Sequence, residues 1–280
     1  MKQKRIPLGM FLVSVLLVII YYSTFIWLYE RFSAADSYYS HGFLVPFICG
    51  FLIWQKKDKL RNMKADSSIS GLILLILGLV MQVLSVVLGV YLISEVSLML
   101  VLFGLVLYLF GSKIKNEVAL ALLFMLFMFP IPMFLINYIT FPLRMLVTTT
   151  AVFSLEKLGL PVMRNGFEII FPDSSLVVGT PCSGLRSQIS FIALSYLFAY
   201  FLNTDMKRRV FLFAMAAPVA IFTNFLRIMS LSLVAFVYGE APATEGFFHD
   251  FSGIMVFVIG FALLAGLRSA LECHDLKENI

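Results

Sequence analysis

The stretch around which this chain is organised is Gly179-Thr180-Pro181-Cys182-Ser183-Gly184-Leu185-Arg186, which leads directly into an apolar run from Ile189 to Leu202. Proline is tolerated in the first turn of a helix and little further in, so Pro181 predicts that a helix begins here. The unpaired N–H groups and the macrodipole at a helix N-terminus favour negative charge. We therefore expect the Cys182 thiol to ionise more readily than a free cysteine, and the thiolate is its nucleophilic form.

The composition indicates a membrane protein. Of the 280 residues, 61% are hydrophobic and only 13% are charged, and the mean hydropathy is +0.97. Soluble domains carry roughly 25% charged residues. Apolar runs of about 20 residues recur along the whole chain, so we expect an all-α polytopic membrane protein whose residues 1–280 form a single integral-membrane domain. The first apolar run is followed by no small-residue cleavage site, which indicates a retained helix rather than a signal peptide.

The hydropathy pattern predicts about eight transmembrane helices. They are expected at about residues 7–28, 41–55, 69–88, 93–110, 117–129, 183–202, 209–228 and 249–267. The apolar segment 138–158 contains Pro142, Arg144 and Glu156, so we interpret it as re-entrant or interfacial rather than as a further span. Residues 166–171, the turn 172–175 and residues 176–178 resemble a small β-hairpin just before Cys182.

The distribution of basic residues predicts the orientation. Most of the 21 lysines and arginines fall in segments on one side of the eight spans, including both termini. The positive-inside rule makes that side cytoplasmic, which places the hairpin, Cys182, Arg227, His249 and His41 at the outer face of the plasma (inner) membrane. The net charge of +5 is spread over short loops instead of clustering on one face, which argues against a nucleic-acid partner.

The three cysteines differ in their expected positions. Cys49 lies within a predicted span and Cys273 in the inner tail, so neither can form a disulfide with Cys182 across the bilayer. A protein zinc site needs three or four ligands, and only Cys182, His249 and His41 share the outer side, so we expect no metal and no cofactor. The alternative for Cys182 is a small buried residue at a tight turn.

Two further polar clusters interrupt apolar sequence. Asn224 and Arg227 are three residues apart and so share one face of a helix. An arginine at membrane depth is costly and usually functional, the alternative being a side chain that snorkels to the headgroups. His249 begins the last span with Asp250 beside it, and a capping or interfacial role is its alternative. Arg186 has the alternative of a simple interfacial anchor.

Together these residues would equip a site for acyl transfer. Cys182 would supply a thiolate nucleophile, His249 a general base and acid, and Arg227 a cation over the tetrahedral oxyanion. The three lie far apart in the sequence but at the same predicted end of the helix bundle.

The sequence resembles the exosortase/archaeosortase family of membrane-embedded cysteine transpeptidases. The resemblance extends over about residues 38 to 270 and rests on four motifs in order: Tyr39–Pro46, Cys182–Arg186, Asn224–Ile228 and His249–Gly253. The chain departs from the family at Thr180-Pro181, where many members have Glu-Ala. The departure leaves the catalytic residues intact and concerns the subfamily and its recognition motif.

The resemblance implies a function in protein sorting. The substrate would be an exported protein with a C-terminal sorting tail, made of a short motif, a transmembrane helix and a basic cluster. Cys182 would attack the motif at the outer membrane surface to form a thioester, which would pass to an acceptor in the cell envelope (a lipid, a glycan or water). A second tier of orienting or substrate-binding groups would comprise Asn224, Arg186, His41, Ser183 and Gly184.

Two other function classes remain open. The first is a non-enzymatic accessory of lipid or polysaccharide transport that binds an anionic headgroup with Arg227, Arg186 and His249. This class predicts that Cys182→Ser retains activity, whereas a thiolate mechanism predicts its loss. The second is a membrane scaffold without chemistry, which leaves Arg227 and the hairpin unexplained.

Overall fold

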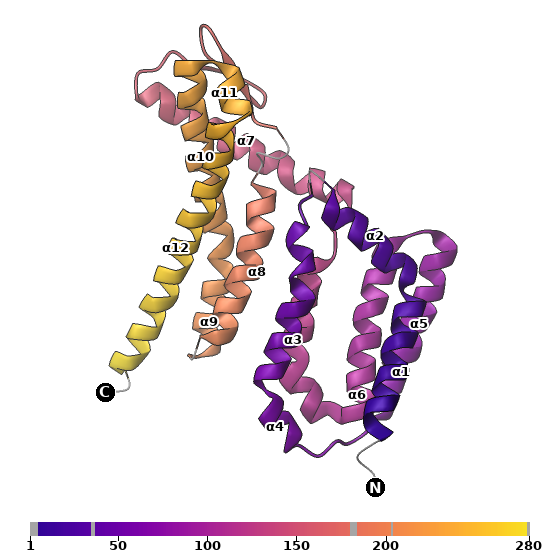
Figure 1. Cartoon of the computed structure of the whole chain (residues 1–280). Helices are drawn as coiled ribbons and strands as arrows, with labels where there is room; N and C mark the ends of the chain where they lie inside the picture. Colours follow the sequence, from indigo (N-terminus) through magenta and orange to yellow (C-terminus); the bar gives the residue numbers. More distant parts are fainter. Residues whose placement is uncertain (1–4, 35–36, 180–183, 203, 279–280) are drawn as a thin grey trace. The chain divides into compact units, whose positions relative to one another are not determined.

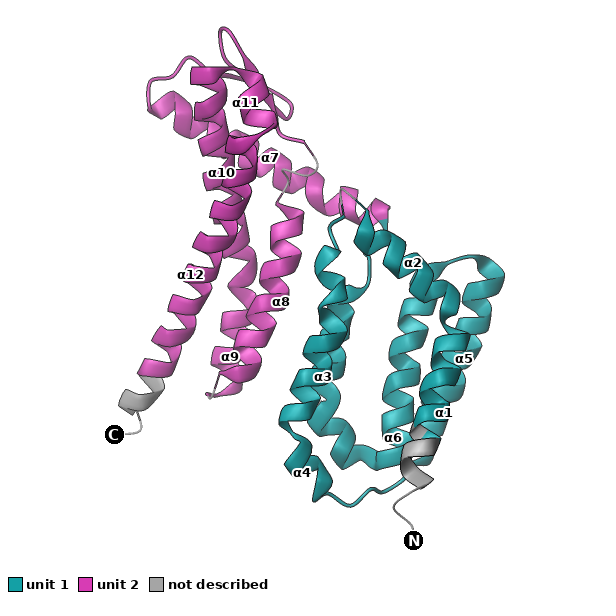
Figure 2. Cartoon of the chain, in the orientation of Figure 1, with its two compact units in different colours: residues 1–132 teal, residues 133–280 magenta. Residues whose placement is uncertain are grey.

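The computed structural model describes residues 5–34, 37–179, 184–202 and 204–278. The chain divides into two compact units, residues 1–132 and 133–280 (Figure 2). Both units consist mainly of helices (Figure 1), and a small three-stranded sheet belongs to the second. The predicted class, a helical membrane protein with a small β element, is confirmed.

The described elements of the first unit are all helical. Its elements are α1 (Arg5–Ile20), α2 (Tyr22–Ser33), the 3-10 turn η1 (Ser40–Phe43), α3 (Val45–Gln55), α4 (Lys57–Arg61), α5 (Ile69–Leu88), α6 (Tyr91–Phe124) and the 3-10 turn η2 (Met125–Met128). The predicted first span is bent by 70° between α1 and α2. The bend lies at Tyr21, whose side chain is fully buried and whose hydroxyl bonds to Ser97 Oγ at 2.6 Å.

Helix α6 changes direction at Gly111, which has φ 84° and ψ 177°. This conformation favours glycine, and a Cβ at Gly111 would overlap the carbonyl of Asp66. The first part of α6 packs against α5, and the second part lies beside α3 (Figure 1). The residue therefore separates two helices that the hydropathy pattern predicts as distinct.

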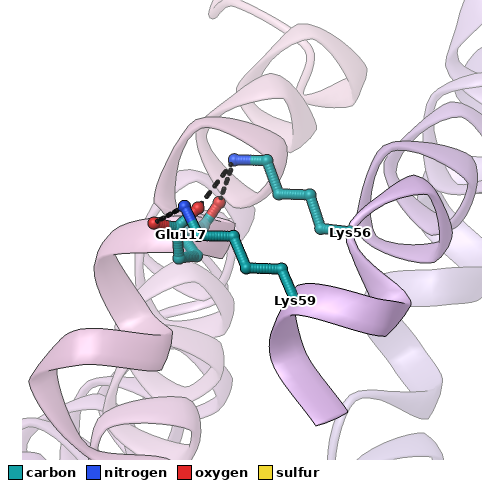
Figure 3. Close-up of polar contacts among 3 residues, drawn as sticks. All are labelled: Lys56, Lys59 and Glu117. Carbon is teal, nitrogen blue, oxygen red and sulfur yellow. Dashed lines mark hydrogen bonds and ion pairs between the residues drawn. The ribbon is translucent and has the colours of Figure 1, made fainter. Parts of the chain in front are cut away.

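Two lysines tie the second part of α6 to the end of α3 and to α4. Lys56 Nζ donates to the backbone carbonyl of Glu117 at 2.8 Å and to its Oε2 at 3.3 Å. Lys59 Nζ donates to Glu117 Oε1 at 2.6 Å (Figure 3). One carboxylate thus neutralises part of the basic loop that the sequence assigns to the cytoplasmic side.

The second unit combines a helix bundle with the sheet. Its elements are α7 (Met133–Lys157), β1 (Met163–Asn165), β2 (Glu168–Ile170), β3 (Ser175–Val177), α8 (Leu185–Phe201), α9 (Met206–Ala214), α10 (Ala216–Tyr238), α11 (Glu240–Thr244) and α12 (Phe247–Glu278). Helices α8, α10 and α12 pack through a core that includes Phe191, Ala220 and Leu264. In Figure 1, α7 crosses α10 obliquely instead of running alongside α8, α10 and α12.

The sheet has the order β1-β2-β3, with both pairs antiparallel. The predicted hairpin is confirmed as β2 and β3, which pair Glu168 with Val177. Strand β1 was not predicted, because its three residues are all exposed and provide no buried face. The two residues that connect β1 to β2 are Gly166 and Phe167, and a two-residue loop that begins with a positive-φ glycine is a typical hairpin signal that would have indicated the additional strand.

The inner face of the sheet packs on three helices, α7, α10 and α11. Ile169, Leu176 and Val178 are buried in one apolar cluster with residues of α7 and α10. Other members of that cluster are Val147, Ala151 and Leu155 of α7 and Ile228, Leu231 and Ala235 of α10. Burial of this apolar surface stabilises the contact by about 25 cal/mol per Å².

Five helices among the described residues are long and apolar enough to cross a membrane, or six if the bent pair α1–α2 is one span. The chain is a multi-pass membrane protein, but the count of eight stays a prediction. Two of the eight are joined in α6, while the helix Ser40–Gln55 and the 17-residue α8 are short. Residues 138–157 belong to the continuous helix α7 despite Pro142, and α7 is one of the five candidate spans, so the interfacial placement of this segment stays a prediction.

Candidate active site

Arg227 and His249 lie next to each other in the second unit. Arg227 is on α10, and His249 is in the first turn of α12, which packs against α10. Nη2 of Arg227 lies 3.2 Å from Nε2 of His249, and both side chains are half-buried. The expected proximity of these two residues is therefore present.

The contact determines the tautomer of His249. A guanidinium group only donates hydrogen bonds, so Nε2 of His249 is the acceptor and carries no proton. The proton is then on Nδ1, which lies 3.3 Å from the carbonyl oxygen of Ala243 in α11. His249 thus lies between α10 and α11, with Nδ1 facing the Ala243 carbonyl and Nε2 facing Arg227.

Ser252 is a third member of this cluster. Its hydroxyl accepts from Nε of Arg227 at 3.2 Å and donates to the carbonyl of His249 at 2.7 Å. Its side chain is 3% exposed. Ser252 is part of the motif His249–Gly253 but was not predicted to have a role of its own, although a serine three residues after His249 shares its helix face.

Asn224 brings the beginning of α8 to the same helix. Its side chain is buried one turn before Arg227 on α10. Gly184, the N-cap of α8, has φ 80°, and a Cβ there would lie 2.7 Å from Cγ of Asn224. The backbone at the start of α8 therefore packs directly on the Asn224 side chain.

The described residues do not include all of the predicted site. Cys182 and Ser183, with Thr180 and Pro181 before them, lie outside the described residues. The helix expected after them is α8, which begins at Leu185. Arg186 lies on the exposed side of the first turn of α8.

The chain on the other side of the cysteine motif is held by Arg144 of α7. Its Nε donates to the carbonyl of Val178 at 2.8 Å, and its guanidinium lies 3.9 Å from the centroid of the Phe167 ring. Val178 is fully buried at the end of the sheet. Arg144, the arginine of segment 138–158, thus binds the backbone directly after the last residue of β3.

His41 belongs to the first unit, where it connects the 3-10 turns η1 and η2. Its Nε2 donates to the carbonyl of Phe127 at 3.1 Å. The neighbouring Tyr39 hydroxyl accepts from the N–H of Ile131 at 2.8 Å. Burial raises the pKa of Tyr39 to about 12, and the Ile131 hydrogen bond opposes the shift. The early motif therefore ties η1 to the segment around η2, and a substrate-binding role of His41 stays a prediction.

The remaining cysteines are separate from this cluster. Cys49 is a buried free thiol in α3 that donates to the carbonyl of Ala121 at 3.1 Å, and Cys273 is an exposed free thiol in α12. In the described part of the chain, no three His, Cys, Asp or Glu side chains are grouped to hold a metal ion.

Comparison with known families agrees with the motifs. A family model described as transmembrane exosortase matches residues 27–266, which is most of the chain. The chain belongs to the transmembrane exosortase family. This family consists of membrane cysteine peptidases and transpeptidases, so exosortase membership indicates the processing of proteins that carry sorting signals. We found no match among curated proteins or solved structures.

Proposed function

We propose that this exosortase cleaves the C-terminal sorting tail of exported proteins through a thioester on Cys182. The observation that carries the proposal is the contact of Arg227 with His249, together with the packing of Gly184 on Asn224. Asn224 is one helical turn from Arg227, and Cys182 is only two residues before Gly184. Two residues span at most about 7 Å, so chain connectivity supports a thiol close to the pair.

His249 is suited to move the proton. Its unprotonated Nε2 would accept the proton of the Cys182 thiol, and the thiolate would attack the backbone carbonyl carbon of the sorting motif. The carbon–sulfur bond forms first, and the peptide carbon–nitrogen bond then breaks. The imidazolium would return its proton to the leaving amine, so that the released tail has a neutral amino terminus.

Arg227 is suited to stabilise the oxyanion. Of its five N–H groups, one contacts Ser252 and one contacts His249 among the described residues. The other groups would donate to the negative oxygen of the tetrahedral intermediate, where such donors contribute most to the rate. The His249 contact would be exchanged for the oxyanion when substrate enters, which frees Nε2 to act as the base.

The second half of the reaction would release the enzyme. A nucleophile from a lipid, a glycan or water attacks the thioester carbonyl, and Cys182 leaves as the thiolate. His249 would take the proton of that nucleophile. Cleavage and transfer thus need no cofactor in this proposal.

The test is co-expression with a tagged protein that bears a sorting-type tail from the same genome. Wild type would be compared with Cys182→Ala and Cys182→Ser, and Cys273→Ala is the matched control because that thiol is exposed and outside the cluster. The mass of the tagged protein reports tail loss and identifies the acceptor.

We expect tail loss in wild type and Cys273→Ala and an intact tail in both Cys182 variants. Loss of the tail in the Cys182→Ala strain would contradict the thioester mechanism. If wild type leaves every tailed protein of the genome intact, the proposal fails and binding of an anionic headgroup by the Arg227–His249 pair becomes the better account.

A further inference from the structure

We infer that Ser252 is a positioning residue that holds the Arg227 guanidinium and, through it, the tautomer of His249. A role of Ser252 in catalysis rests on the proposed function. The geometry itself involves only described residues of α10, α11 and α12.

The donor and acceptor roles of the Ser252 hydroxyl are determined by its two partners. Its single proton is used in the 2.7 Å bond to the carbonyl of His249, so only its lone pairs face Arg227. It must therefore accept the Nε–H of Arg227 over 3.2 Å. Because the side chain is 3% exposed, water has little access to replace either contact.

The two contacts of Arg227 use one edge of its guanidinium group. Nε–H and one N–H of Nη2 lie side by side on that edge, and they bind Ser252 Oγ and His249 Nε2 respectively. Two parallel contacts fix the plane of a guanidinium, whereas one contact leaves it free to rotate. The opposite edge, with Nη1, is then presented in a defined direction.

The same arrangement determines the imidazole. With Arg227 donating to Nε2, only the Nδ1–H form can donate to the carbonyl of Ala243. Without Ser252 the guanidinium can turn away, and the Nε2–H form is no longer excluded. Ser252 thus acts on the base through Arg227, without contacting the reacting atoms.

If Ser252 had only a structural role, its replacement would leave the His249 tautomer unchanged. Hydroxyl bonds to a carbonyl one turn earlier are common in helices, and Ser230 makes one to Leu226 at 2.9 Å on α10. If Ser252 only satisfies the carbonyl of His249, its replacement should resemble Ser230→Ala. Ser230→Ala is therefore the matched control.

The experiment reads the tautomer directly. Full-length protein in lipid nanodiscs is labelled with 15N in its three histidines, and His249→Gln assigns the His249 ring signals. In wild type and Ser230→Ala we expect a protonated Nδ1 and an unprotonated Nε2. In Ser252→Ala and in Ser252→Cys, which keeps the side-chain volume but accepts poorly, we expect a mixture of both tautomers.

Tail cleavage is measured on the same variants. Loss of a hydrogen bond to a charged group predicts a fall in kcat of about 10- to 100-fold with KM within about twofold. Ser252→Thr keeps the hydroxyl and should restore the wild-type tautomer. A thermal unfolding midpoint close to that of wild type serves as the check that each variant is folded.

An unchanged His249 tautomer in folded Ser252→Ala or Ser252→Cys would overturn the inference, whether or not any tail is cleaved. If wild type cleaves no tail while the tautomer shifts as expected, the positioning inference stands and the proposed function falls. The two failures are thereby distinguished.

Discussion

The guanidinium of Arg227 donates from Nη2 to Nε2 of His249 over 3.2 Å, and it does so while Nε contacts Ser252. A lysine has one ammonium group and cannot reproduce two parallel contacts on one edge. We therefore expect Arg227→Lys to lower the rate of tail cleavage by about 100-fold or more, as for removal of an oxyanion donor. Single-turnover cleavage of a purified tailed substrate measures this.

Arg268 provides the control for that substitution. It also uses Nε and Nη2, which bind Glu272 Oε1 at 3.1 and 2.9 Å on α12, where both side chains are half-buried. Arg268→Lys should change the cleavage rate by less than about twofold, because Arg268 lies about five helical turns from His249 along α12. Equal losses in the two variants would mean that the effect of Arg227→Lys is not specific to its contacts.

Gly184 is predicted to tolerate no side chain. Its φ of 80° costs a residue with a Cβ about 1–2 kcal/mol, and the new Cβ would lie 2.7 Å from Cγ of Asn224. Gly184→Ala should lower the thermal unfolding midpoint. Adding Asn224→Ala removes the overlap but leaves the backbone strain, so the double variant should be less destabilised than the sum of the two single variants. Strict additivity would argue against the contact.

The sequence predicted the hairpin β2–β3, the proximity of Arg227 and His249, and a helix after the cysteine motif, although α8 begins at Leu185 and not at the predicted Ser183. The helix and the hairpin rest on local signals, such as Pro181 before an apolar run. The proximity of Arg227 and His249 rests on their assignment to the same side of the membrane. Ser252 and the tautomer of His249 could not be predicted, since they depend on the distance between α10, α11 and α12. The bend at Tyr21 was also missed, because a continuous apolar run gives no sign of a 70° change in direction.

Arg144 is expected to stabilise the attachment of β3 to α7. Removing its charged hydrogen bond to Val178 with Arg144→Met should cost about 1.5–3 kcal/mol, less where water reaches the half-buried side chain. The matched control is Arg164→Met, since Arg164 also links the sheet to α7, through Met145, but is exposed. Thermal unfolding in detergent should show a clearly lower midpoint for Arg144→Met. Equal unfolding midpoints of Arg144→Met and Arg164→Met would contradict a stabilising role of Arg144.

Tyr39 predicts a loss of stability at high pH. Its pKa is raised from 10.0 to about 12 in the folded chain, so the folded state favours the protonated phenol. This contribution is complete below pH 10 and is lost as the pH rises through about 12. Tyr39→Phe should be less stable below pH 10, because it lacks the acceptor for Ile131, but should lose stability less steeply above it. Parallel slopes of the unfolding midpoint against pH would contradict the prediction.

The orientation of the chain can be tested with its own exposed thiol. Cys273 in α12 and the Lys56–Lys59–Glu117 cluster belong to segments that the positive-inside rule assigns to the cytoplasm. In a Cys182→Ala background, a membrane-impermeant maleimide should label Cys273 only after the cells are permeabilised.

Asn165 of β1 is exposed and on the predicted outer side, so Asn165→Cys should be labelled in intact cells. Buried Cys49 should remain unlabelled in both conditions, which controls for unfolding. Labelling of Cys273 in intact cells would show that the topology is the opposite of the predicted one, with the Arg227–His249 pair facing the cytoplasm. Such a result would exclude a reaction with exported tails, since the sheet, α10 and the start of α12 belong to one packed unit.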